Sequence, residues 1–267
     1  MTKSPIKLPI KPPVTLGVVN AVDTQAELDA LARRYQQAGG VGIDLLNALG
    51  MQAEGLLAQL PKGARDGLQS ATETALAHAM TAAHTSRAVV PDQASWLNSA
   101  VSAAMGAAGG FGGLPTALAE LPVTTTLLLR VIEGVAESHG FDVTSESVRF
   151  DCVQVFSAGG PLAQDDGADL AFLSARTALS GAAMQAIIAR VAPRLSIVLG
   201  QKLAAQTVPV LGAVAGAATN YAYTSYYTDM AHVHFGLRKL AIDADHPHDE
   251  LVAALRERML PVPVKRA

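Results

Sequence analysis

Cysteine is almost absent from this chain. Cys152 is the single cysteine among 267 residues, so no internal disulfide can form, which is typical of a protein in a reducing compartment. Val148, Val155 and Phe156 share a face with Cys152 at helical spacing, and this pattern is typical of a buried helix face. We therefore expect Cys152 to be a core residue.

Charged and aromatic side chains are also scarce. Charged residues make up 16% of the chain and aromatic residues 4%, while hydrophobic residues reach 50%. The apolar surface therefore comes mainly from small and aliphatic side chains, above all alanine, which has the highest helix propensity. The formal net charge is −3, and no basic stripe with interleaved aromatics occurs. We therefore expect no nucleic-acid partner.

The first 22 residues lack the continuous apolar run of a secretory signal. Prolines interrupt them, and Lys3, Lys7 and Lys11 make them positive. The segment is either a solvated extended arm or a weak tether to an anionic membrane surface. The length suits one large core, so we expect an arm over 1–22, a helical domain over 23–260 and a tail over 261–267.

Helix start and stop signals recur along the chain, whereas the alternating pattern of strands is hard to find. The fold class we expect is all-α, a single compact domain of about ten helices with a long helix rich in Ala and Gly in the C-terminal half. In chain order, the predicted helices run from Asp23 or Thr24 to Gly39, over 43–60 and 64–87, from Asp92 through Met105, from Pro122 to His139, through 148–156, over 165–191, from Pro193 onward as a shorter helix, over 209–242 and through 251–259.

Two long stretches contain no charged side chain, namely 93–119 and 203–228. Each is long enough in residues to cross a hydrocarbon core, but glycines and prolines interrupt the first, and the second contains Pro209 and Asn220. Gly212 and Gly216 in the second stretch are spaced so that another helix can approach closely. Tight internal packing, an interfacial or re-entrant membrane contact and a true span all remain open.

Three separate segments carry a family resemblance. Within 105–140, a glycine-rich turn precedes Leu121-Pro122, TTTLLLR at 124–130 and ESHGFD at 137–142. SESVR at 145–149 then leads to Val155-Phe156, and PVLGA at 209–213 precedes Asn220 and the run 229–240. In this order, the segments resemble the EcsC family over roughly residues 35–242.

The resemblance implies a role but no reaction. The family takes its name from a gene beside the ATPase and membrane subunits of an ABC transporter, and it offers no catalytic residues to carry over. It implies an accessory protein of a transporter or of secretion, located in the cytoplasm and peripheral on the inner face of the cytoplasmic membrane. The partners it implies are membrane lipid or ABC transporter subunits.

No sequence motif of catalysis stands out. The nucleophile elbow, the phosphate loop, the zinc-protease motif and the dinucleotide fingerprint are all missing from the sequence, and we expect no cofactor. His232 and His234 are two residues apart, which places them on different sides of a helix and prevents them from sharing a metal. Spacing instead pairs His232 with Asp229, either as an ordinary hydrogen-bonded pair or as an acid and base.

The acid- and histidine-rich run 243–250 contains the densest set of metal-ligand types. A helix start needs an Asp cap and acids in its first turn, and this need explains the run more simply. We therefore expect no metal site.

Together these observations favour a non-enzymatic, membrane-associated accessory protein that binds a lipid or an apolar partner helix. Its ligand- or helix-contact residues would be Gly212, Gly216 and Asn220. Two alternatives remain, a hydrolase whose site contains Asp229 and His232, and a soluble scaffold that binds another protein.

Overall fold

The computed structural model describes residues 23–41, 44, 60–89, 104, 113–158, 170–173, 181–206 and 212–259. All regular elements within these ranges are helices, which confirms the all-α fold class. There are seven α-helices and one 3-10 helix there, fewer than the ten or so predicted, and the predicted helices over 43–60 and 92–105 lie almost wholly outside the described residues. The elements are α1 (Thr24–Gln36), α3 (Lys62–Val89), α5 (Gly113–Ser138), α6 (Glu146–Val155), η2 (Leu170–Leu173), α7 (Gly181–Gln206), α8 (Gly212–Asp243) and α9 (His248–Met259).

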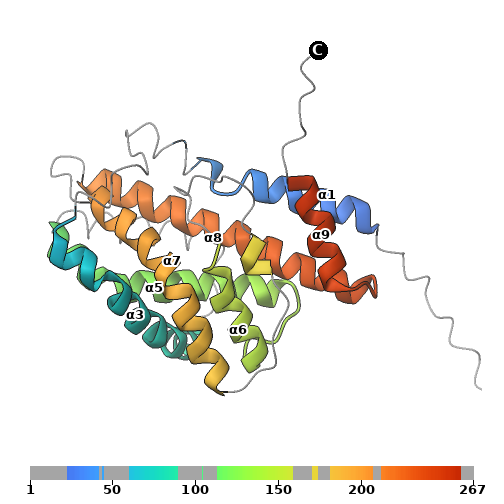
Figure 1. Cartoon of the computed structure of the whole chain (residues 1–267), viewed down its shortest axis with the longest axis horizontal. Coiled ribbons are helices and arrows are strands. Elements are labelled where there is room, and N and C mark those ends of the chain that lie inside the picture. Colours follow the sequence, from blue (N-terminus) through green and yellow to red (C-terminus); the bar gives the residue numbers. More distant parts are fainter. Residues whose placement is uncertain are drawn as a thin grey trace, which may run out of the picture.

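Four long helices form the centre of the molecule. α5 packs against α3, α7 and α8, and α7 also packs against α3 and α8. Figure 1 shows that α5 and α8 begin at the same end of the molecule, where α7 ends. At the opposite end, α1 and α9 lie against each other and against α8. α8 therefore joins the two ends.

One continuous cluster of buried apolar side chains fills the interior and reaches from Leu28 in α1 to Leu255 in α9. Cys152 and Phe156 are fully buried in it, which confirms the predicted core position of the thiol. The predicted start of the first helix at Asp23 or Thr24 agrees with α1, which begins at Thr24. Asp23 caps the helix by accepting hydrogen bonds from the first-turn N–H groups, and Leu28 and Leu31 form its buried face.

Two prolines that were expected to mark helix boundaries lie inside helices instead. α5 continues through Pro122 and α7 continues through Pro193, so the predicted start at Pro122 and the predicted break at Pro193 are wrong. A proline in a helix interior removes one backbone hydrogen bond and crowds the preceding turn. In the turn after each proline, a hydroxyl bonds to the proline carbonyl: Thr126 donates to Pro122 and Ser196 to Pro193, each at 2.7 Å.

Charge is distributed unevenly along α8. Its first part, from Gly212 to Thr228, contains no charged residue, whereas the part from Asp229 to Asp243 contains two acids and two bases. None of the helices that the structure describes is both long and apolar enough to cross a bilayer. Of the charge-free stretch 203–228, the described residues form the last turn of α7 and the first half of α8.

Candidate functional site

The first residue of the candidate site is His139, which directly follows α5. The chain leaves α5 through Gly140, whose φ of +85° is accessible to glycine but strained for other residues. The N–H of Gly140 donates to the Glu137 carbonyl at 2.8 Å, and the N–H of Phe141 donates to the Ala136 carbonyl at 3.1 Å. This pair of bonds is the Schellman arrangement of a helix C-terminus. It fixes the backbone at His139, just before the glycine.

His139 faces His232, which lies in the second half of α8. The distance from His139 Nε2 to His232 Nδ1 is 3.0 Å, and the ring planes are inclined by 69°. One of these nitrogens donates the proton and the other accepts it, because a hydrogen bond needs one of each. Both side chains are partly buried. The pair therefore links α5 to α8 through two adjacent imidazole rings.

Asp229 lies one turn before His232 on α8 and connects to α1. Arg34 donates to one of its carboxylate oxygens at 3.4 Å, and the N–H of Gly39, just beyond the end of α1, donates to the other at 3.3 Å. Sequence spacing paired Asp229 with His232. The structure places both on the face of α8 that meets α1 and the end of α5, with the carboxylate bonded to the α1 region and the imidazole bonded to His139.

The surroundings favour the neutral form of both imidazoles. Burial lowers the pKa of His232 to about 4, with smaller contributions from Arg34 and His139. Burial, Arg34 and Lys239 lower the pKa of His139 from its usual value. Burial raises the pKa of Asp229, although the Gly39 hydrogen bond and Arg34 act against it. At neutral pH, both histidines are therefore uncharged and able to accept a proton.

A metal ion fits this arrangement poorly. The two imidazoles would supply only two ligands, and Arg34 places a positive charge beside them. Across the residues that the structure describes, no group of three His, Cys, Asp or Glu side chains could hold a metal ion. The chemistry that the site offers is proton acceptance by a neutral imidazole.

A comparison with known protein families identifies the family of this chain. The profile described as the EcsC protein family matches residues 52–240, which is more than half of the chain. The chain belongs to the EcsC family. The resemblance seen in the sequence is thereby confirmed. Comparisons with curated proteins and with solved structures gave no match.

The EcsC match covers only part of the candidate site. His139, Asp229 and His232 lie inside the matched range, whereas Arg34 and Gly39 lie before it. The two imidazoles and the carboxylate therefore belong to the EcsC region. The groups that bind the carboxylate come from the region of α1, outside that match.

The other predicted contact residues lie far from the histidines. Gly216 and Asn220 are buried in the first half of α8, and Gly216 precedes Asp229 by roughly 20 Å of helix at 1.5 Å per residue. Gly212 is the first residue of α8, and its contacts lie outside the described part of the protein. The structure therefore separates the sequence-predicted residues into two regions at opposite halves of one helix.

Lys202 is a buried polar residue that sequence reasoning missed. Its side chain is fully buried in α7, and its ammonium group donates to the hydroxyl of Thr124 in α5 at 2.9 Å. Buried lysines are uncommon because burial disfavours the charge. The only signal in the sequence is its position, immediately before the stretch 203–228 that contains no charge.

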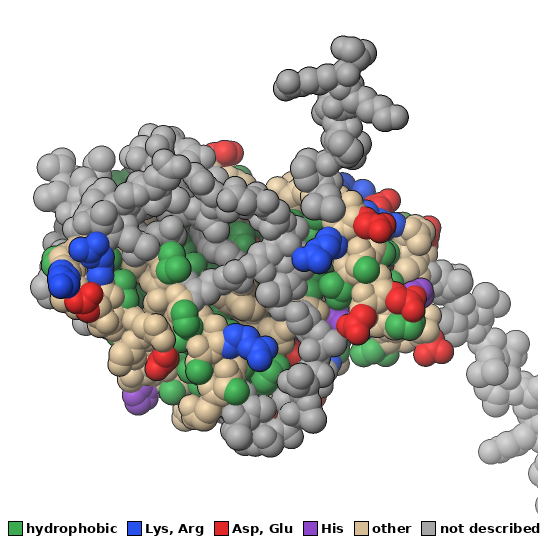
Figure 2. All heavy atoms as spheres, viewed as in Figure 1, with side chains coloured by type: hydrophobic (Ala, Val, Ile, Leu, Met, Phe, Trp, Pro, Cys, Tyr) green, Lys and Arg blue, Asp and Glu red, His purple; other side chains and the backbone are tan. Residues whose placement is uncertain are grey.

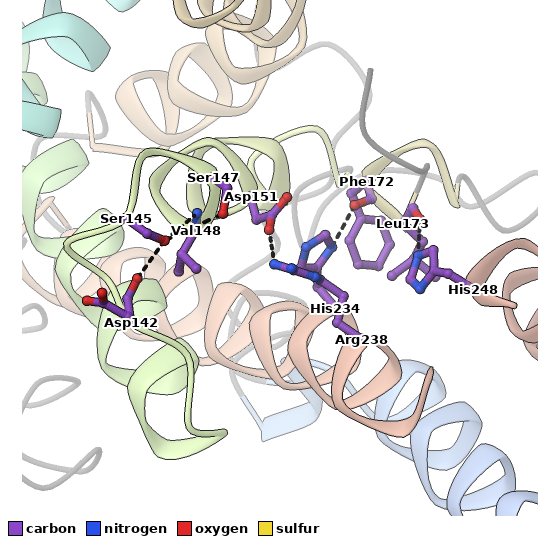
Figure 3. A network of polar contacts seen from close by, with 10 residues as sticks. All are labelled: Asp142, Ser145, Ser147, Val148, Asp151, Phe172, Leu173, His234, Arg238 and His248. Atoms are coloured by element: carbon purple, nitrogen blue, oxygen red, sulfur yellow. Dashed lines mark hydrogen bonds and ion pairs between the residues drawn. The ribbon is translucent and has the colours of Figure 1, made fainter. Parts of the chain in front are cut away.

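A second polar network, shown in Figure 3, holds α6, η2, α8 and α9 together. Arg238 of α8 forms an ion pair with Asp151 of α6, whose side chain is only 2% exposed, and lies over the ring of Phe141. His234 bonds to the Phe172 carbonyl of η2 at 2.8 Å.

His248 of α9 bonds to the next carbonyl of η2, that of Leu173, at 3.0 Å. The acids Asp249 and Glu250 occupy the first turn of α9, as predicted for the run 243–250, but the predicted Asp cap is wrong, because α9 begins at His248, directly after Pro247. The residues of this network thus tie helices and η2 together through side-chain and backbone contacts.

Proposed function

We propose that this EcsC protein is a non-enzymatic accessory protein that attaches to the inner face of the cytoplasmic membrane through one end of its helical bundle. This end, which we name the charge-free end, consists of the last turn of α7 and the part of α8 from Gly212 to Thr228. The observation that carries the proposal is its composition, because no charged side chain occurs there over a whole half of α8.

Exposure at the charge-free end supports this proposal. Val214, in the first turn of α8, is 56% exposed. A single exposed valine is ordinary on a protein surface, so the absence of charge is the more informative feature. Moving this part of α8 into the interfacial region of a bilayer buries apolar area, at about 25 cal/mol per Å², and its own side chains carry no charge that would have to leave water.

Several polar side chains of this end lie in the interior of the protein. The hydroxyl of Tyr223 donates to the Val198 carbonyl at 3.1 Å, and Asn220 and Thr224 are buried inside the bundle. The outer surface can therefore approach lipid while the neutral polar side chains stay in the interior. The link to an ABC transporter or to secretion rests on the family resemblance.

Flotation of the full chain with liposomes tests the proposal. We expect the protein to float with vesicles that contain anionic lipid, and we expect Val214→Glu to reduce the floated fraction severalfold, because a charge in the interface opposes insertion. Ile242→Glu is the matched control, since Ile242 is 66% exposed near the other end of the same helix. Equal behaviour of both variants, or no flotation of the unmodified chain, would contradict the proposal and favour a soluble protein-binding scaffold.

A second candidate function is a hydrolase that uses Asp229 and His232. The observation that favours it is the contact between two imidazoles, one of which has its pKa lowered to about 4 and is therefore a free base at neutral pH. An ester and phosphoester panel assayed with His232→Gln and Asp229→Asn tests this candidate. Turnover that disappears in His232→Gln but persists in Val214→Glu would favour the hydrolase.

A further inference from the structure

Helix α1 packs against α8 and α9, and its contacts with α8 lie close to the histidine pair. On the apolar side, Leu31 lies against Gly236 of α8 so closely that a Cβ atom on this glycine would come within 2.8 Å of the leucine side chain. On the polar side, Asp229 accepts from Arg34 and from the Gly39 N–H at 3.4 and 3.3 Å. Both polar contacts are longer than a typical hydrogen bond.

The two imidazoles lie beside these contacts. The same Cβ position at Gly236 would be 3.6 Å from the Cε1 atom of His139, so His139 and Leu31 meet at one point of α8. His139 is in turn hydrogen-bonded to His232 at 3.0 Å. The surface on which α1 rests therefore contains both histidines.

We propose that His139 and His232 form an acid-sensitive latch, which lets α1 dock on α8 while both rings are neutral and releases α1 when they take up protons. The proposal concerns a conformational change of α1 and does not depend on the membrane role. Its geometric basis is the contact of Leu31, Arg34 and Gly39 with the surface formed by the histidine pair, Asp229 and Gly236.

The charges that face the histidine pair are mainly positive. Arg34 of α1 acts on both rings, and Lys239 of α8 acts on His139. The carboxylate nearest in sequence, Asp229, is already bonded to Arg34 and to Gly39. A proton on either ring thus adds a positive charge beside Arg34, and protons on both rings also repel each other across the 3.0 Å contact.

The pKa shifts give the direction of the effect. The pKa of both histidines is lowered in the docked state, so the docked state has its full stability above the unperturbed histidine pKa of 6.5 and loses stability as the pH falls toward about 4. The raised pKa of Asp229 acts in the opposite direction. On acidification the two imidazoles destabilise the docked state and the one carboxyl stabilises it. The net effect of acid is therefore release of α1.

The expected size follows from His232 alone. If release restores its ordinary pKa, linkage gives an increase in the opening equilibrium at pH 5 of about tenfold, after an allowance for the partial exposure of the ring. The contacts between α1 and α9 oppose the release of α1. Arg258 of α9 bonds to Asp29 of α1 at 2.8 Å, and this bond holds α1 without a histidine.

Hydrogen exchange of the backbone amides, corrected for the intrinsic pH dependence, tests the latch. We expect the protection of α1 to fall about tenfold between pH 7 and pH 5, while the protection of α3, which packs on α5 and α7, stays constant. In the double variant His139→Gln/His232→Gln, which keeps side-chain hydrogen bonding but cannot take up a proton at this pH, the protection of α1 should be the same at both pH values. An equal fall in both proteins, or no fall in either, would overturn the proposal.

A second variant tests the latch even if the double variant fails to fold. Arg34 has an exposed side chain, so Arg34→Gln should fold normally. It removes the positive charge that opposes protonation of both rings, and it should therefore reduce the ratio of α1 protection between pH 7 and pH 5. An unchanged ratio in Arg34→Gln, or a uniform loss of protection over all helices, contradicts a local latch.

Discussion

Both halves of α8 pack against the helical bundle, but their polar groups differ. Both bury aromatic rings and small residues against the bundle, for example Tyr223 in the first half and Phe235 in the second. The first half contains neutral polar groups, one of which, the Tyr223 hydroxyl, donates to the Val198 carbonyl. The second half uses charges, with Asp229 bonded to Arg34 and Arg238 bonded to Asp151.

This difference separates two kinds of sensitivity. Neutral hydrogen bonds and apolar contacts depend little on pH and salt, whereas ion pairs and histidines depend on both. Figure 2 shows basic and acidic side chains at both ends of the face in view, so the contrast belongs to α8 and to the turns around it rather than to the whole surface. We expect the first half of α8 to respond to lipid and the second half to pH.

The largest effect is expected from the buried ion pair in the second half. Arg238→Ala leaves the carboxylate of Asp151 buried without its guanidinium, and removal of one partner of a buried pair costs about 3–5 kcal/mol of unfolding free energy. Denaturant unfolding of Arg238→Ala measures this loss. The double variant Asp151→Leu/Arg238→Met is the control and should lose much less, because it leaves no isolated charge. A loss in Arg238→Ala below about 1 kcal/mol would show that water reaches the pair.

An intermediate effect is expected from Gly216 in the first half. Because this glycine is buried, Gly216→Leu should overpack the contact with the neighbouring helices and reduce the unfolding free energy by about 1–3 kcal/mol. Thermal melting measures the loss. Gly67→Ala is the control, since a Cβ atom at this exposed position of α3 meets nothing within 4 Å.

Two outcomes for Gly216 would change the account of the first half. If Gly216→Leu leaves the melting temperature unchanged and strengthens liposome flotation, the glycine faces lipid rather than a helix. If neither quantity changes, the glycine faces solvent, in disagreement with its burial.

The smallest effect is expected from a surface pair of the second half. Lys239 and Asp243 form an ion pair one turn apart, and the Lys239 side chain is about half exposed. Such pairs contribute about 0.3–0.5 kcal/mol. Lys239→Met should therefore change the melting temperature by less than either variant above. It should also raise the pH at which the histidines take up protons, since Lys239 lowers the pKa of His139. A pH response identical to that of the unmodified chain would exclude Lys239 from the latch.

Local signals in the sequence predicted local structure well. A helix start at Asp23 or Thr24 was expected, and Asp23 caps α1; the helical spacing of Val148, Cys152, Val155 and Phe156 gave the correct buried face. These features depend on interactions within one or two turns, which a sequence displays directly. Pro122 and Pro193 were misjudged because packing on several helices outweighs the loss of one backbone hydrogen bond.

The sequence did not predict contacts between residues that are far apart in the chain. His232 was singled out with Asp229, three residues away on the same helix, but its imidazole partner His139 lies 93 positions earlier. The bond from Lys202 to Thr124 spans 78 positions. No spacing rule connects residues on different helices, so only the arrangement of α5, α7 and α8 could reveal these pairs.

The central claim is that one half of α8 contacts lipid and the other does not, and a fluorescent label on each half tests it most directly. Cys152 is fully buried, so a thiol-reactive, polarity-sensitive dye should react with an introduced cysteine in Val214→Cys or Ile242→Cys and hardly at all with the unmodified chain. On addition of liposomes that contain anionic lipid, the account predicts a blue shift of the dye at position 214 and none at position 242. A blue shift at position 242 alone, equal shifts at both positions, or no shift at position 214 would contradict it.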